Sequence, residues 1–482
     1  MGIVLKQSFN NILTTYLGFA VGALNVLFLY PNFLVPEHYG LITFLLSAST
    51  LVWPLMGFGA PNTLIKFYTA CHSDSDKNRL LTTMLVIPLI VSAILGVLGV
   101  VFYQALLNYF ESNQAVQNYI GLIFIISVAI SYFELFYAWA KLTYKSVFGN
   151  FMKEVFHRVG VTFLLLGVYF DYIGLEGFIY ALTGIYILRM FILMVYAFKL
   201  LPPKLDFRLP DNFSRVAKYS FLILIAGSIS TALLDLDKVM IEHYLPIEQV
   251  SVYAIAVYVA SVIAVPSRAM KQIAMPITAM FLNKNKKQEL AKLYKQTSVS
   301  LLLVSGLIFT LIITNVEQLY ELIPDEYQIE TGIIIFLCGI KLYENFLGNC
   351  NSILFNSDYY RLVLMIGIGV VILAIIFNIV FIPRLGMWGA AIATFSTFFA
   401  FFSVKLFLVY QKFHMHPFTS KTLPITGLII VSSLVFYFWS FDIYPLLSIA
   451  IKGILTTVLY AIIAFKLNLS EELTQFLQQR KK

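Results

Sequence analysis

A short polar stretch inside an apolar segment carries the side chains best suited to chemistry. Residues 339–352 read GIKLYENFLGNCNS, and long aliphatic runs flank them on both sides. In a helix, Lys341, Asn345 and Asn349 would share one face, and Glu344 would lie within reach of Lys341. A cation beside amide groups can bind a ligand that carries negative charge and hydroxyls. The stretch is therefore a candidate polar site within a hydrophobic environment.

Further ionisable and amide side chains interrupt other apolar segments. A charge at the centre of a bilayer costs roughly 2.5–3.5 kcal/mol, so such residues are expected to face protein or water. The candidates for lining a hydrated cavity are Asn25, Arg189, Lys238, Lys341, Asn345, Asn349 and Lys452. The carboxylates expected to respond to an ion gradient are Glu134, Asp235 and Glu344.

A structural role is the alternative for several of these residues. Asp235 with Lys238, and Lys341 with Glu344, can form internally neutralised pairs that only stabilise helix contacts. Glu134 can be hydrogen-bonded to neighbouring hydroxyls, and Lys238 can extend toward the interface. The sequence leaves both readings open.

No catalytic or metal-binding pattern accompanies these residues. Cys71, Cys338 and Cys350 lack the spacing of a disulfide framework or a zinc site. A phosphate-binding Walker loop, a Ser-His-Asp arrangement and a His/Cys cluster are all missing from the sequence. We therefore expect no enzyme activity, no cofactor and no metal.

The composition predicts an all-α polytopic membrane protein. Of the 482 residues, 60% are hydrophobic and 12% are charged, against roughly 25% charged in soluble domains. Runs long enough to cross a bilayer predict about fourteen transmembrane helices near residues 9–31, 38–60, 80–103, 118–140, 151–170, 174–198, 219–243, 251–275, 298–314, 331–354, 362–382, 387–410, 425–440 and 446–465.

The basic residues are distributed as a topology signal. They gather in alternate connections, at 66–79, 141–153, 199–215 and 284–295, while the other connections are acidic. Because short cytoplasmic loops are rich in Lys and Arg, this pattern predicts cytoplasmic N- and C-termini. The net charge of +8 is then explained without a nucleic-acid partner. The sequence does not fix the oligomeric state, and we assume a monomer.

Weak internal symmetry predicts two lobes. A shift of about 212 residues brings Pro54 onto Pro266 and aligns GLEGFIYA with GMWGAAIA. An even number of helices per repeat gives both lobes the same orientation, so the repeats are parallel. The predicted parts are an N-terminal six-helix lobe at 1–200, a cytoplasmic Pro-rich linker at 201–214, a C-terminal six-helix lobe at 215–415, two extra helices at 416–470 and a basic cytoplasmic tail at 471–482. We expect the polar residues to line the seam between the lobes.

Three stretches resemble one family of membrane proteins. They are YPNFLVPEHYGLITFLL with GFGAPNTLIKFY, LLDLDKVMIEHYLPIEQVSVYAIA, and FIPRLGMWGAAIATFSTF, in this order along the chain. The sequence is similar to the lipid-linked oligosaccharide flippases, which form the polysaccharide-exporter branch of the multidrug/oligosaccharidyl-lipid/polysaccharide (MOP) exporter superfamily. The resemblance implies a fold like that of the MATE exporters.

The resemblance also implies a function. It implies a flippase in the bacterial inner membrane that moves an undecaprenyl-diphosphate-linked O-antigen, capsule or exopolysaccharide unit to the outer leaflet by alternating access. The cationic candidates would then bind the diphosphate, the asparagines would bind sugar hydroxyls, and a proton or sodium gradient would supply energy. A peptidoglycan-precursor flippase and a cation-coupled multidrug exporter of the same superfamily are the alternatives. A membrane glycosyltransferase is disfavoured.

Overall fold

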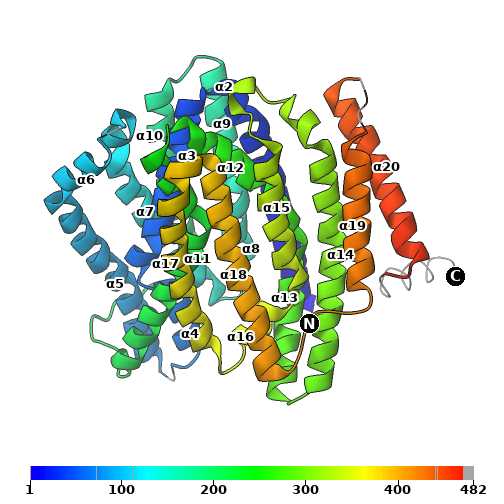
Figure 1. The fold of residues 1–482 in the computed structure, drawn as a ribbon. Coiled ribbons are helices and arrows are strands. Elements are labelled where there is room, and N and C mark those ends of the chain that lie inside the picture. The colour runs from blue at the N-terminus through cyan, green and yellow to red at the C-terminus, as the bar shows by residue number, and fades with distance from the viewer. Residues whose placement is uncertain (1, 72, 112, 440, 442, 470–482) are drawn as a thin grey trace. The chain divides into compact units, whose positions relative to one another are not determined.

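Every regular element in the described part of the chain is a helix (Figure 1). The computed structural model describes residues 2–71, 73–111, 113–439, 441 and 443–469. The chain divides into two compact units, Met1–Ser251 and Val252–Lys482, called here the N-unit and the C-unit. The predicted basic tail at 471–482 lies outside the described residues.

The N-unit contains the first elements of the chain. They are α1 (Gly2–Leu24), the π-helix η1 (Asn25–Leu29), α2 (Tyr30–Phe33), α3 (Pro36–Gly57), α4 (Ala60–Tyr68), α5 (Asp74–Val101), α6 (Tyr103–Tyr109), α7 (Gln114–Lys141), α8 (Val147–Phe151), the π-helix η2 (Met152–Phe156), α9 (His157–Tyr169), α10 (Leu175–Leu200) and α11 (Phe213–Tyr244). Helix α7 packs against α3, α4 and α10, so it occupies the core of this unit. The helix α12 (Glu248–Ser261) begins in the N-unit and continues into the C-unit.

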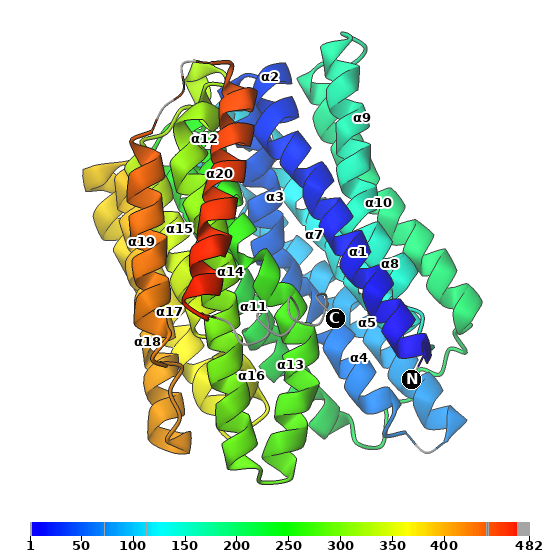
Figure 2. The same ribbon diagram turned by 90° about the vertical axis from the view of Figure 1, so that its right-hand side faces the viewer.

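The C-unit contains the remaining elements. They are the 3-10 helix η3 (Val262–Ala264), α13 (Val265–Asn283), α14 (Lys287–Tyr320), the 3-10 helix η4 (Asp325–Tyr327), α15 (Thr331–Phe346), α16 (Cys350–Phe355), α17 (Tyr360–Leu385), α18 (Met387–Phe413), α19 (Thr422–Tyr437) and α20 (Pro445–Lys466). Helices α17 and α18 form an antiparallel hairpin, and α19 and α20 run beside α14 (Figure 2).

The helices confirm the predicted fold class of a multi-pass, all-α membrane protein. Among the described residues, 11 helices are long and apolar enough to cross a bilayer, and each corresponds to one of the predicted spans. The other three predicted spans are shorter or interrupted. The span at 151–170 is divided among α8, η2 and α9, the span at 331–354 breaks between α15 and α16, and the span at 425–440 is the 16-residue α19.

The boundary between the compact units falls later than the predicted linker. Helix α11 follows the linker at 201–214 but packs against α3 and α4 of the N-unit. The repeat in the sequence assigns this helix to the second lobe. The lobe boundaries inferred from the repeat therefore remain a prediction, and the compact units differ from them by one helix.

The linker is attached to the N-unit by polar contacts. Arg79 at the start of α5 lies 3.3 Å from Asp206 and 3.1 Å from Asp211. The Asp206 amide donates to the Thr82 hydroxyl at 2.9 Å. Hydrogen bonds from Arg208, which lies 2.8 Å away, hold the pKa of Asp206 below its usual range. These contacts tie the connection after α10 to the first turns of α5.

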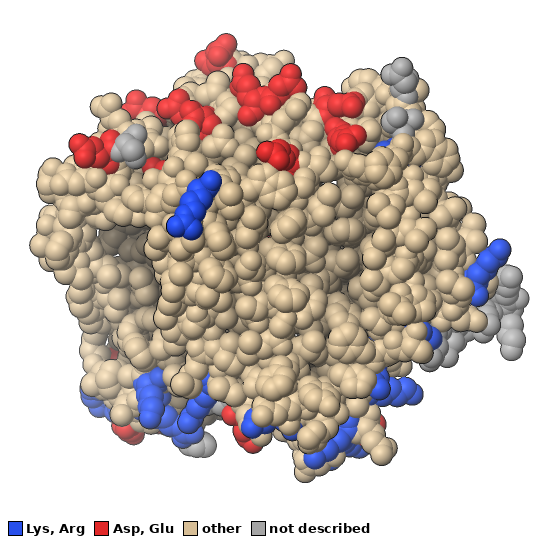
Figure 3. Space-filling model, in the orientation of Figure 1, with Lys and Arg blue, Asp and Glu red and all other residues tan. Residues whose placement is uncertain are grey.

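The two ends of the helices differ in charge. On the face shown in Figure 3, Asp and Glu gather at one end and most Lys and Arg gather at the other. Between these ends the surface is almost entirely uncharged. This separation agrees with the alternating charge of the connections in the sequence.

Candidate functional site

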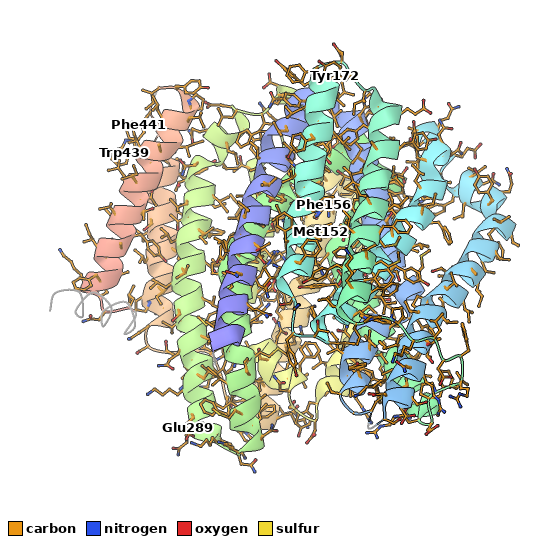
Figure 4. The ribbon with its side chains drawn as sticks, turned by 180° about the vertical axis from the view of Figure 1, so that it is seen from behind. Met152, Phe156, Tyr172, Glu289, Trp439 and Phe441 are labelled. Carbon is orange, nitrogen blue, oxygen red and sulfur yellow. The ribbon has the colours of Figure 1, made fainter. Side chains whose placement is uncertain are left out.

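An ion pair between two helical segments anchors a polar cluster in the N-unit. Lys153 of η2 lies 2.6 Å from the Glu134 carboxylate of α7. The adjacent residue, Glu154, lies 3.3 Å from Arg158, one turn further along. Figure 4 shows Met152 and Phe156, which bound η2, partway along the helical run and far from Tyr172 beyond its end. The charge pattern of the sequence assigns Lys153 to a connection, whereas the structure places it within the helix.

Arg189 contributes a second cation to this cluster. Its side chain is only 6% exposed, and its guanidinium lies over the rings of Phe133 and Tyr186, at 4.7 and 4.1 Å from their centroids. The Nε atom has no hydrogen-bond partner among the described residues. No carboxylate of the described chain lies within ion-pair distance of Arg189, so aromatic faces provide its main contacts.

A small cavity adjoins the Glu134 ion pair. It has a volume of about 90 Å³, and its wall includes Glu134, Lys141, Trp53 and Asn62. This space is large enough for ordered water, which needs roughly 10–15 Å³ per molecule by the same measure. The carboxylate is therefore both paired and open to hydration.

Asn25 lies in the π-helix η1 and bonds to the facing helix. Its amide nitrogen donates to the carbonyl of Arg158 at 2.8 Å, and its oxygen accepts from the Thr162 hydroxyl at 2.8 Å. The residue is 3% exposed. Both polar atoms are engaged by the main chain and a side chain of the α8–α9 run, so Asn25 joins two helices in this conformation.

Asp235 and Lys238 form the pair that their spacing predicted. Their charged atoms lie 2.6 Å apart on α11, and the hydroxyl of Ser47 on α3 donates to Asp235 at 3.3 Å. Both side chains are largely buried. The pair is thus neutralised within one helix and attached to its neighbour.

A triad of charges forms the corresponding cluster in the C-unit. Glu344 of α15 lies 3.3 Å from Lys341 on the same helix and 3.7 Å from Lys271 on α13. The Lys341 ammonium also lies 5.0 Å from the centre of the Phe398 ring on α18. Two lysines therefore share one carboxylate. The sequence predicted the first contact and not the second.

The polar stripe predicted at 339–352 is wrong as a single helical face. Helix α15 ends at Phe346, and α16 begins at Cys350. Gly348, between them, has φ of +51°, and its Cα faces the backbone of Ser298, so a Cβ would lie 2.7 Å from the Ser298 nitrogen. The tight approach of α14 and the left-handed glycine break the helix and redirect the residues that follow it.

The two asparagines of this stretch bond within the C-unit. Asn345 donates to the carbonyl of Ile263 at 2.5 Å and to the Ser305 hydroxyl at 2.7 Å. The Ile263 carbonyl lies in η3, where α12 gives way to α13 just before Pro266, and it also accepts from the Ser305 hydroxyl at 3.2 Å. Asn349 donates to the hydroxyl of Thr278. Asn345 therefore caps the interruption in the preceding span.

Lys452 is the most deeply buried of the predicted cations. It is 1% exposed and donates to the amide oxygen of Gln318 at 3.4 Å. These residues join α20 to α14, and no described acid pairs with Lys452 at ion-pair distance. The structure does not bring it into contact with the Lys341 cluster.

Sequence reasoning missed four charged members of the clusters. Lys153 was assigned to a connection, and Lys271, Glu154 and Arg158 had no assigned role. Their partners lie on other helices or one turn away. Lys405 was also missed. It is 5% exposed, donates to Asn351 at 2.9 Å and lies 3.5 Å from the centre of the Phe401 ring. Its position in the middle of an apolar run was the available signal.

Solved structures with the same architecture identify the fold. The chain is similar to the lipid II flippase MurJ in an inward closed conformation, with a TM-score of 0.70 and 14% identity over 94% of this chain and 98% of that one. It is also similar to an inward-facing MATE family multidrug resistance transporter of the MOP superfamily, with a TM-score of 0.64 and 13% identity over 85% and 94% of the two chains. A third is the MATE multidrug transporter DinF-BH, with a TM-score of 0.59 and 13% identity over 85% and 95%.

The fold is the one that MurJ and the MATE transporters share. No family model and no curated protein matches the sequence. At these identities the likeness concerns the fold, and it confirms the MATE-like fold expected from the three sequence stretches. The matched proteins are described as transporters and a flippase, none as an enzyme.

Proposed function

We propose that this protein is a flippase for a polyprenyl-diphosphate-linked oligosaccharide, such as an O-antigen, capsule or exopolysaccharide repeat unit, in the bacterial inner membrane. It would move this lipid from the inner to the outer leaflet by alternating access, with both termini in the cytoplasm. The observation that carries the proposal is an excess of positive charge in the two polar clusters, one around Glu134 in the N-unit and one around Glu344 in the C-unit.

The excess can be counted from the contacts. In the N-unit, the two carboxylates of the pairs Glu134–Lys153 and Glu154–Arg158 are matched by two bases. Arg189 is additional and makes aromatic contacts instead. In the C-unit, the single carboxylate of Glu344 faces two lysines, and Lys405 is additional. A diphosphate can supply the negative charge that these clusters lack.

The roles of the predicted residues follow this reasoning. Arg189 and Lys341 are proposed to bind the diphosphate, and Lys238 and Lys452 to contribute positive potential. Asn25, Asn345 and Asn349 already bond within their units, so a sugar would reach them only in another conformation.

Energy coupling is proposed at the carboxylates. Glu134, Asp235 and Glu344 each lie within 3.3 Å of a lysine. A proton or sodium ion would therefore compete with that lysine for the carboxylate, and its binding would release the lysine to the substrate. This exchange couples an ion gradient to anion binding without any cofactor.

Two alternatives share the fold. A peptidoglycan-precursor flippase is favoured by the likeness to MurJ, which covers 94% of this chain, compared with 85% for the MATE transporters. It would use the same lipid-diphosphate chemistry with different sugars. A cation-coupled multidrug exporter is disfavoured, because an excess of buried lysine and arginine repels cationic drugs.

Transport by charge-neutralised variants tests the proposal. The variant Arg189→Ala/Lys341→Ala is reconstituted in vesicles with a fluorescent polyprenyl-diphosphate oligosaccharide, and translocation is followed by quenching from one side. We expect transport to fall by at least tenfold. The matched control is Lys199→Ala/Lys204→Ala, which removes one charge from the last turn of α10 and one from the connection after it. Normal transport by the first variant at normal expression would contradict an anion-binding function.

A further inference from the structure

An open pocket at one end of the C-unit is separate from the charge clusters. It has a volume of about 520 Å³, within the range of roughly 300–1,000 Å³ typical of small-ligand sites. One wall is a face of the first turns of α14, and the other is the segment that precedes α19. The lining residues are Gln288, Ala291, Lys292, Lys295, Gln296, Val299, Ser300, Thr419, Ser420 and Lys421.

The lining is suited to a phosphate group. Three lysines, several hydroxyls and two amides face the space, and its described lining residues include no carboxylate. The 16-residue helix α19 starts immediately after Lys421, so the positive end of its dipole lies at the pocket. The nearby Glu289 is outside the lining and pairs with Lys286 at 3.0 Å.

The pocket lies at the depth of lipid headgroups. Helix α14 has 34 residues, which gives about 51 Å at 1.5 Å per residue, whereas the hydrocarbon core is only about 30 Å thick. The charged first turns of α14 therefore extend beyond the core. Figure 4 shows Glu289 at the opposite end of the C-unit from Trp439 and Phe441, and Leu423, just inside α19, is 81% exposed.

The pocket walls are fixed by the packing behind them. Val299 belongs to a core cluster with Ile425 and Ile429 of α19 and Tyr460 of α20. At Gly306 of α14, a Cβ would lie 2.3 Å from the side chain of Ile429, so the two helices are in close contact. The polar groups are thus held on a rigid frame with an apolar surface leading away from them.

We propose that this pocket binds the headgroup of an anionic membrane phospholipid. The phosphate lies among Lys292, Lys295 and Lys421, and the acyl chains lie along the exposed apolar face of α19. Basic pockets between helices at the cytoplasmic surface are suited to acidic lipid headgroups. The occupant is a resident lipid, distinct from the transported one, so this proposal stands without the proposed function.

Lipid titration of the intact protein in detergent, read by native mass spectrometry, tests this site. The probes are phosphatidylglycerol and phosphatidylcholine with the same acyl chains. A surface lysine contributes about a fivefold factor in affinity for acidic lipid, so Lys292→Gln/Lys295→Gln/Lys421→Gln is expected to weaken phosphatidylglycerol binding roughly 100-fold. Phosphatidylcholine binding stays unchanged. The single variant Lys295→Gln is expected to lose about fivefold in phosphatidylglycerol affinity. It provides the test of the site if the triple variant fails to fold.

The control removes the same charge from the same end of the unit. Lys284→Gln/Lys287→Gln/Lys412→Gln alters three lysines outside the pocket and is expected to bind phosphatidylglycerol as the wild type does. If the two triple variants lost phosphatidylglycerol affinity equally, the lipid would be attracted by the general surface charge, and the proposed binding site would be overturned. Displacement of phosphatidylglycerol by millimolar inorganic phosphate, or by a smaller amount of polyprenyl diphosphate, would overturn the choice of occupant.

Discussion

Replacing Arg189 with methionine tests whether the charge of this buried side chain serves transport or stability. The side chain is 6% exposed and relies on two aromatic rings at 4.1 and 4.7 Å. Each cation–π contact contributes roughly 0.5–2 kcal/mol, whereas burying an ion costs several kcal/mol. Methionine keeps the packing volume and removes the charge. We therefore expect Arg189→Met to stabilise the N-unit by about 1–3 kcal/mol.

The assay combines melting and transport. For a unit of 251 residues, this gain corresponds to a rise in melting temperature of roughly 2–12 °C. Loss of one charged contact to a diphosphate costs about 1.5–3 kcal/mol, so transport should fall roughly 10–100-fold. A stabilised and inactive variant is the expected result.

Arg158→Met is the matched control in the same cluster. Arg158 is paired with Glu154 at 3.3 Å, and both side chains are largely buried. Its removal leaves an unpaired carboxylate, so stability should fall by about 1–3 kcal/mol. If Arg189→Met also melted at a lower temperature and transported normally, Arg189 would be a structural residue and the reasoning would be refuted.

Three further predictions concern the frame around the clusters. Asn345→Leu removes two hydrogen bonds, to the Ile263 carbonyl and to the Ser305 hydroxyl, and should lower stability by about 1–3 kcal/mol in thermal melts; an unchanged melting temperature would contradict this role. Gly348→Ala forces alanine into a left-handed conformation against backbone and should cost at least about 1 kcal/mol, measured the same way. Because the pKa of Asp206 is lowered by Arg208, its stabilising contribution is present above the ordinary aspartate pKa and is lost as pH falls below it. Asp206→Asn should therefore make the linker as sensitive to proteolysis at neutral pH as the wild-type linker is in acid. If the variant and the wild type resisted proteolysis equally at neutral pH, the stabilising role of Asp206 would be disproved.

The sequence predicted the helices well because their cause is local. A run of about 20 apolar residues must form a helix in a bilayer to satisfy its own backbone, and eleven long helices match predicted spans. The interruptions escaped prediction where they depend on a neighbour. The break at Gly348 requires the close approach of Ser298, which no pattern within residues 331–354 reveals.

The candidate sites were predictable only in part for the same reason. Pairs on one helix, such as Asp235 with Lys238, follow from spacing. Partners on different helices, such as Glu134 with Lys153, depend on how the helices pack. For Glu134 the sequence left hydroxyl partners open as the structural alternative, whereas its partner is a lysine from the π-helix of the following span.

The π-helix at Met152–Phe156 makes the fifth span sensitive to length as well as composition. A π-turn holds one residue more than an α-turn, so deleting a single residue there would restore a regular α-helix. Because both kinds of turn complete about one revolution, His157–Tyr169 would keep its orientation, and Thr162 would still face Asn25. The change would fall on the π-turn itself, which carries Lys153 and Glu154. A one-residue gap in this segment would therefore mark a relative whose polar cluster has different partners at this turn.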